Sequence, residues 1–99
     1  MASGVTKVIR GSFIGTGAAI NIRSVGFRPR SVHLWNIGGL AKGDWLEGMA
    51  DASAFVEVTA GTKSLVTSGG ITPLSDGFTL GADTDLNVEG ELVRFEAIQ

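Results

Sequence analysis

The sequence contains no cysteine and no tyrosine, and it has two prolines and one histidine among 99 residues. Without cysteine the chain has no disulfide, no thiolate metal ligand and no cysteine nucleophile. No apolar run approaches the roughly 18 residues that a membrane span needs, and the first residues lack the apolar core of a signal peptide. We therefore expect synthesis in a cytoplasm without export by the general secretory route, and no membrane partner.

Net charge is also small, at a formal value of −2 at pH 7. Binding to nucleic acid needs an excess of lysine and arginine, so we expect no nucleic-acid partner. The charge is unevenly distributed: residues 1–43 hold six basic and no acidic residues, whereas residues 44–99 hold two basic and all ten acidic residues. Either strands from the two halves pair and their charges alternate, or oppositely charged faces meet between copies of the molecule.

Glycine is abundant, with 15 residues spaced between short apolar runs. This spacing is typical of a turn-rich β protein, and 99 residues are enough for one domain. Alternation of side chains with a period of two predicts strands over 30–37, 55–59 and 92–98. We expect a single β domain over residues 1–99, with a flexible N-terminal arm at residues 1–4. The predicted fold class is all-β, a small antiparallel β-sandwich or jelly-roll-like module of about eight short strands.

Four local patterns make narrower predictions. Strands over 5–13 and 18–25 flank a glycine-rich turn, which predicts a hairpin. The strand over 30–37 carries bulky side chains on both faces, so we expect it to be central in the sheet or covered on both sides. Residues 44–49 fit a strand better than a single helical turn, because Gly48 weakens a helix. A short strand over 64–67 is expected to end at Ser68-Gly69-Gly70.

Residues with catalytic or metal-binding chemistry are few. Asp83, Asp85 and Asn87 match the first ligand positions of a calcium loop. The glycine that should follow them is missing, which favours a solvated acidic turn over a cation site. Ser31 lies on the same face as His33 only because residues two apart in a strand share a face. This placement favours a structural role for His33 over a catalytic one. We therefore expect no enzymatic activity, no cofactor, no metal site and no small-molecule substrate.

The densest apolar cluster outside the regular alternation lies between residues 45 and 55. Its side chains either cap the end of the core or form an exposed patch for another subunit, since aromatic residues and methionine are common in binding cores. Two arginines of the basic half are added to this cluster. The interface candidates are Trp45, Leu46, Met49, Phe55, Arg28 and Arg30.

Four stretches together carry a family resemblance. They are residues 25–36 (VGFRPRSVHLWN), 68–72 (SGGIT), 76–81 (DGFTLG) and 90–97 (GELVRFEA). In this order, over about residues 5–98, the sequence resembles a group of small bacteriophage virion proteins and fibre-associated modules. In that group a GF-x-P turn precedes a central strand, a GIT…GFT-x-G hairpin follows, and a final strand closes the sheet.

The resemblance implies a virion structural protein, made in the host bacterial cytoplasm and located on the capsid surface. A free-standing chain of this size suits a capsid decoration or cement protein, which adds contacts between shell subunits and stabilises the shell by mass action. The expected partners are the major capsid protein and copies of the chain itself, as a homotrimer. The alternative is a tail or fibre-associated module that contributes to host attachment or carbohydrate binding.

Overall fold

The computed structural model describes residues 7–99, so the arm expected at residues 1–4 lies outside the described residues. Within residues 7–99 the regular elements are all β-strands, and no helix there is long and apolar enough to cross a membrane. The strands are β1 (Val8–Ile14), β2 (Ile20–Ile22), β3 (Ser31–Asn36), β4 (Ala41–Leu46), β5 (Ser53–Glu57), β6 (Lys63–Leu74), β7 (Gly77–Leu80) and β8 (Leu92–Ile98).

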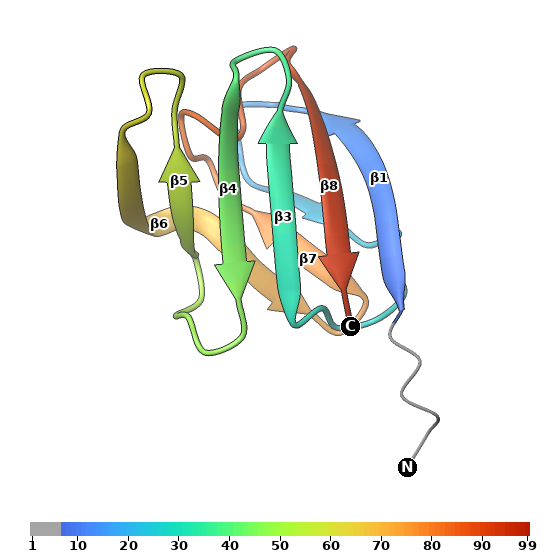
Figure 1. Cartoon of the computed structure of the whole chain (residues 1–99). Coiled ribbons are helices and arrows are strands. Elements are labelled where there is room, and N and C mark those ends of the chain that lie inside the picture. Colours follow the sequence, from blue (N-terminus) through green and yellow to red (C-terminus); the bar gives the residue numbers. More distant parts are fainter. Residues whose placement is uncertain (1–6) are drawn as a thin grey trace.

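All eight strands join one antiparallel sheet in the order β1-β8-β3-β4-β5-β6-β7-β2. Figure 1 shows that this sheet curls, so that β6 and β7 pass behind the layer formed by β5, β4, β3, β8 and β1. The predicted all-β class and antiparallel pairing are confirmed. The division into two sheets expected of a sandwich or jelly roll is not confirmed, because β6 continues from one half of the sheet into the other.

The bend of the sheet lies within β6. Residues 63–66 pair with β5 and residues 71–74 pair with β7, and the register against β5 shifts between Ser53 and Ala54. Gly69 has a φ of +76°, and a Cβ on Gly70 would stand 2.5 Å from the backbone of Ser53. Glycine is therefore needed where the two strands approach. The strand passes through the glycines at which the sequence pattern predicted its end, so that prediction was wrong.

The hairpin expected between the first two strands does not form, because β1 and β2 stand at opposite ends of the sheet. Their connection is instead tied to the loop between β7 and β8 by the side chain of Asn87. Its amide oxygen accepts hydrogen bonds from the N–H groups of Thr16 (2.8 Å) and Gly17 (3.3 Å). Its amide nitrogen donates to the carbonyl oxygens of Ala18 (2.7 Å) and Gly81 (2.9 Å). These contacts hold the β1–β2 connection beside that loop.

The core lies between the two halves of the curled sheet. Phe78 on β7 packs edge-on against Phe95 on β8, with ring centroids 5.3 Å apart. Leu86, from the loop between β7 and β8, is fully buried and fills the space above Gly43, where a Cβ would lie 2.6 Å from the leucine Cδ1. The buried apolar cluster consists of Val25, Phe27, Val32, Leu34, Trp45, Ala54, Val56, Ile71, Phe78, Leu80, Leu86, Val93, Phe95 and Ala97.

Candidate functional site on the outward face of the sheet

Strand register arranges the side chains that point away from the core into rows across β1, β8, β3, β4, β5 and β6. On β3, for example, Val32 and Leu34 are buried, whereas Trp35, the residue after Leu34, is exposed. Successive side chains of a strand point to opposite faces, so this is the pattern of a half-buried strand. One row is Arg10, Glu96, His33, Asp44, Phe55 and Leu65, and the next is Ser12, Arg94, Trp35, Lys42, Glu57 and Lys63. We call these two rows, together with Ile14, Ile37, Leu40, Leu46 and Leu92, the outward face.

Ion pairs connect neighbouring strands on the outward face. Arg10 Nε lies 2.7 Å from Glu96 Oε2, and Lys42 Nζ lies 3.5 Å from Glu57 Oε1. Each pair joins a cation from the basic half of the chain to an anion from the acidic half. The same is true of Arg23 with Asp76 and of Arg30 with Glu47. Charges of the two halves therefore alternate within the fold, which was the first of the two alternatives for the uneven distribution of charge.

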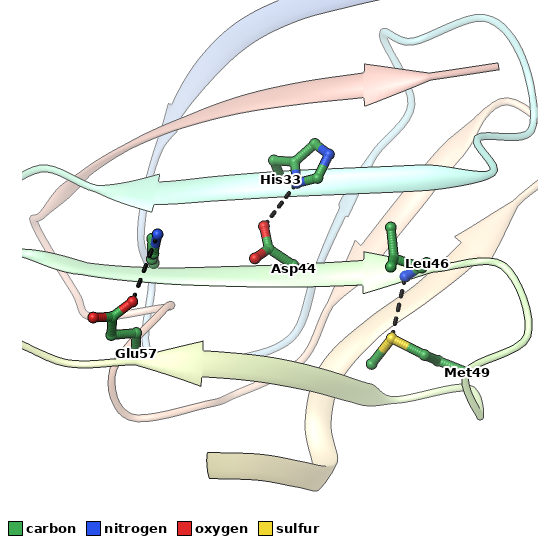
Figure 2. Close-up of polar contacts among 6 residues, drawn as sticks. His33, Asp44, Leu46, Met49 and Glu57 are labelled. Atoms are coloured by element: carbon green, nitrogen blue, oxygen red, sulfur yellow. Dashed lines mark hydrogen bonds and ion pairs between the residues drawn. The ribbon is translucent and has the colours of Figure 1, made fainter. Parts of the chain in front are cut away.

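His33 stands in the middle of the outward face, opposite Asp44 on β4 and Glu96 on β8. Its Nδ1 lies 2.7 Å from Asp44 Oδ1 (Figure 2). This hydrogen bond between the ring and the carboxyl group holds the imidazole in one orientation. The ring also packs beside Trp35, with centroids 6.3 Å apart. His33 lines neither of the two grooves on this face, and its contacts link β3 to β4.

Trp35 separates two shallow grooves on the outward face and is 41% exposed. The larger groove has a volume of about 460 Å³, and its walls include Ile37 and Leu40 with the paired Lys42 and Glu57 at its side. The smaller groove, of about 200 Å³, lies between Trp35 and residues of β1 and β8. An exposed indole with apolar walls beside it can hold an apolar side chain or a flat ring, and the charged pair can fix its orientation.

The structure separates the residues of the predicted apolar cluster. Trp45 is 4% exposed and its Nε1–H donates to the carbonyl oxygen of Ala50 (3.2 Å), so it belongs to the core and presents no surface to a partner. Leu46 and Phe55 are 49% and 45% exposed and lie on the outward face. Met49 is half-buried after a tight turn at Gly48, and its Sδ lies 3.2 Å from the backbone nitrogen of Leu46 (Figure 2). The strand predicted over 44–49 is present as far as Leu46.

Of the two predicted arginines, the structure links Arg30 to the outward face. Arg28 and Arg30 are exposed on either side of the buried Pro29, in the connection between β2 and β3. The carbonyl oxygen of Arg30 accepts a hydrogen bond from the N–H of Glu47 (2.7 Å), and the side chains of this pair approach to 3.9 Å. Glu47 follows Leu46 directly, so the structure brings Arg30 close to the Leu46 end of the face.

Sequence reasoning missed Trp35 as a surface residue. The prediction that this strand is central or covered on both sides is confirmed in its first form, because β3 lies in the interior of the sheet while its outward side is only half-buried. The signal was present in Ser31 and His33, which share the face of Trp35 and are polar, whereas the opposite face carries Val32 and Leu34. Polar residues alternating with aliphatic ones indicate a strand with one solvated face.

The acidic turn predicted at residues 83–87 organises its own loop. Asp83 Oδ1 accepts hydrogen bonds from the backbone N–H groups of Asp85 (2.8 Å) and Leu86 (3.0 Å). The amide of Asn87 points inward and is occupied by backbone groups of two loops. Among the residues that the structure describes, no group of three or more histidine, cysteine or acidic side chains is placed to hold a metal ion.

Comparison with known proteins identifies no relative. A scan of the sequence against protein-family models finds no match. Searches of curated proteins and of solved structures find no match either. A functional interpretation therefore depends on the outward face and on the sequence motifs.

Proposed function

We propose that this chain is a structural protein of a bacteriophage particle, a decoration or cement protein that stabilises the head shell from the capsid surface. The exposed apolar side chains on the outward face are the observation that supports this function best. Among residues 7–99 the exposed large apolar side chains are Val8, Ile9, Ile14, Trp35, Ile37, Leu40, Leu46, Phe55, Leu65 and Leu92. Most of them belong to the outward face. Large apolar side chains gathered on one side of a protein can mark a surface that a partner covers.

The charges on the outward face are compatible with burial against a shell subunit. Arg10 is paired with Glu96, and Lys42 with Glu57, inside the chain. A partner can therefore cover these four groups without leaving either charge of a pair unpaired, which is the costly outcome in a buried contact. Arg94, beside Trp35 in the smaller groove, has no carboxylate partner among the described ion pairs, so a covering partner would need to supply one. Trp35 lies among these charged groups, and a partly exposed tryptophan flanked by grooves is the kind of residue that dominates binding energy. The resemblance to phage virion modules supplies the identity of the partner, the major capsid protein.

The location of the protein is tested by electron microscopy of intact particles of the phage that encodes it, using gold-labelled antibody against the chain. Label distributed over the head is the expected result. Label confined to the tail or its tip would contradict the decoration role and would favour host attachment. Particles without any label would contradict a virion role altogether.

The contact surface is tested by binding the purified protein to shells that lack it. Trp35→Ala should weaken binding by about 30-fold or more, as expected for a binding hot spot worth about 2 kcal/mol. Leu46→Ala probes the other end of the same face, because Leu46 is 49% exposed and pairs with Ser31 at the opposite end of β3 from Trp35. Unchanged binding by both variants, with the fold retained, would exclude the outward face as the contact with the shell.

A second candidate function is carbohydrate binding in the service of host attachment. The larger groove favours it, because Trp35 offers an aromatic platform with Lys42, Glu57 and Thr59 beside it. Sugars stack their apolar faces on such rings and bond their hydroxyls to charged groups at the rim. A glycan array would show binding that Trp35→Ala abolishes and Trp35→Phe largely retains. An array without any bound glycan would contradict this candidate.

A further inference from the structure

β1 is an edge strand whose outer side is open in the described part of the chain. Figure 1 shows β1 at the margin of the sheet, beyond β8. Over residues 7–99 its pairing is with β8 alone. The other edge strand, β2, has three residues, whereas β1 has seven. β1 therefore offers the longer row of backbone groups to a further strand.

Hydrogen bonds at the two ends of β1 establish which of its backbone groups point outward. The carbonyl oxygen of Lys7 accepts from the N–H of Gln99, and the N–H of Gly15 donates to the carbonyl oxygen of Glu91, both at 2.9 Å. Because bonded residues alternate along an antiparallel pair, the odd-numbered residues of β1 bond to β8. The residues that direct N–H and C=O groups out of the free edge are Val8, Arg10, Ser12 and Ile14.

A second β1 strand, antiparallel and centred on Gly11, satisfies all of these outward groups. In this register Val8 lies opposite Ile14 of the second copy, and Arg10 lies opposite Ser12 of the second copy. Each of the four outward residues on each strand then contributes one N–H and one C=O, which makes eight hydrogen bonds between the copies. A pair centred on Arg10 would instead place two arginines opposite each other, and a pair centred on Ser12 would leave Val8 outside the pairing.

Side chains also match in this register. Ile9 is 36% exposed at the edge and would lie opposite Phe13 of the second copy at a position without hydrogen bonds, where side chains approach most closely. An aromatic side chain opposite a β-branched one is a favourable cross-strand pair. Gly11 at the centre keeps the two strands unobstructed and leaves space for the ring of Phe95, whose Cε2 would lie 2.8 Å from a Cβ at that position.

The edge of β1 also lacks the features that usually prevent strands from pairing. It contains no proline and no lysine, and its register with β8 runs without a bulge. Its one charge, Arg10, bonds to Glu96 on β8 at 2.7 Å, so the guanidinium is drawn away from the free edge. Natural proteins normally protect a long edge strand by one of these features, and an edge without them is available to a partner strand.

We propose that the free edge of β1 is a homodimer contact, in which two copies of this chain pair their β1 strands around Gly11 and form one continuous sheet. The contact is isologous, so it closes after two copies. The contact uses the edge of the sheet and not the outward face. The test of the homodimer is therefore independent of the test of the proposed capsid role. The homotrimer expected from the sequence would need a different, head-to-tail surface.

Light scattering on the full chain over a range of concentrations gives the first test. The expected mass at high concentration is twice the 10.2 kDa of one chain. Ser12→Pro removes an outward N–H without touching the bonds to β8, and it should raise the dimer dissociation constant by roughly tenfold or more. Ser12→Ala keeps the N–H and should dimerise like the parent. A monomeric mass at every concentration, or a trimer, would overturn the proposal.

Disulfide cross-linking tests the register of the two strands. The chain has no cysteine of its own, so only the introduced thiols can form a disulfide. A mixture of the Val8→Cys and Ile14→Cys proteins should form a disulfide-linked dimer, since directly opposite residues lie about 5.5 Å apart between Cα atoms. Either variant alone should not, because six residues of strand separate the two thiols by about 20 Å. Equal cross-linking in the mixture and in the single variants would refute pairing around Gly11, even if the protein is a dimer.

Discussion

Replacing Asn87 with alanine tests whether one buried amide holds the β1–β2 connection against the loop between β7 and β8. Asn87 is 2% exposed, and its side chain makes four hydrogen bonds to backbone groups. A net contribution of about 1 kcal/mol from each bond would give about 4 kcal/mol for the set. Three of the partner residues, Thr16, Gly17 and Ala18, are exposed, so water replaces part of the loss. We therefore expect a fall of about 2–4 kcal/mol in the free energy of unfolding.

Thermal and urea unfolding followed by circular dichroism measure this effect. A domain of this size has a total stability of about 5–15 kcal/mol, and each kcal/mol lowers its midpoint by about 4–8 °C. The expected fall in melting temperature is thus roughly 8–32 °C. Asn21→Ala is the matched control, since Asn21 is exposed and accepts one side-chain hydrogen bond from Thr79 (2.7 Å). Its effect should stay within about 0.5 kcal/mol.

Equal stability of the Asn87→Ala and Asn21→Ala proteins would refute this reasoning. It would mean that the two loops find each other through apolar packing alone. A third variant, Asn87→Asp, separates the donor from the acceptor half of the amide. It places a carboxylate against the carbonyl oxygens of Ala18 and Gly81 in place of a donor, so it should destabilise the protein at least as much as alanine does.

Further predictions concern the core and two glycines. Trp45→Ala should lower the free energy of unfolding by about 3–5 kcal/mol, whereas Trp35→Ala, at a 41% exposed position, should change it by less than about 1 kcal/mol; chemical denaturation of the two variants compares them directly. Gly77→Ala should destabilise the protein by more than about 2 kcal/mol, because its Cβ would overlap the carbonyl oxygen of Ile22 on the paired strand. Gly61→Ala should cost only about 1 kcal/mol, since it has a φ of +81° but open space around it. The melting temperature should fall from the wild type to Gly61→Ala and further to Gly77→Ala. A lower melting temperature for Gly61→Ala than for Gly77→Ala would contradict the steric argument.

Of all the features of the fold, the positions of the strands were predicted best from local features of the sequence. The strand predicted over 92–98 is β8, and the strand predicted over 30–37 contains β3. The strand predicted over 55–59 overlaps β5, and β6 and β7 meet in a tight turn at residues 75 and 76. These features depend on alternation and turn chemistry, which act between residues that are neighbours along the chain.

The candidate site was predicted only in part. Leu46 and Phe55 belong to the outward face, but Trp45 is buried and Trp35, which separates the two grooves, was not among the candidates. Alternation indicates that adjacent residues of a strand face opposite ways. It does not indicate which side of the strand the rest of the protein covers, because that depends on how the whole sheet curls.

By itself the sequence determined the all-β fold class, the positions of the main strands and the uneven distribution of charge. In the fold these charges form ion pairs between neighbouring strands. Tertiary structure alone decided that β1 pairs with β8, that β6 bends through its glycines, and that Asn87 is a buried tie between two loops. Each of these depends on partners far away in the chain, as in the bond from Thr16 to Asn87. The free energy of such contacts is gained only when the chain closes on itself, so no local pattern records it.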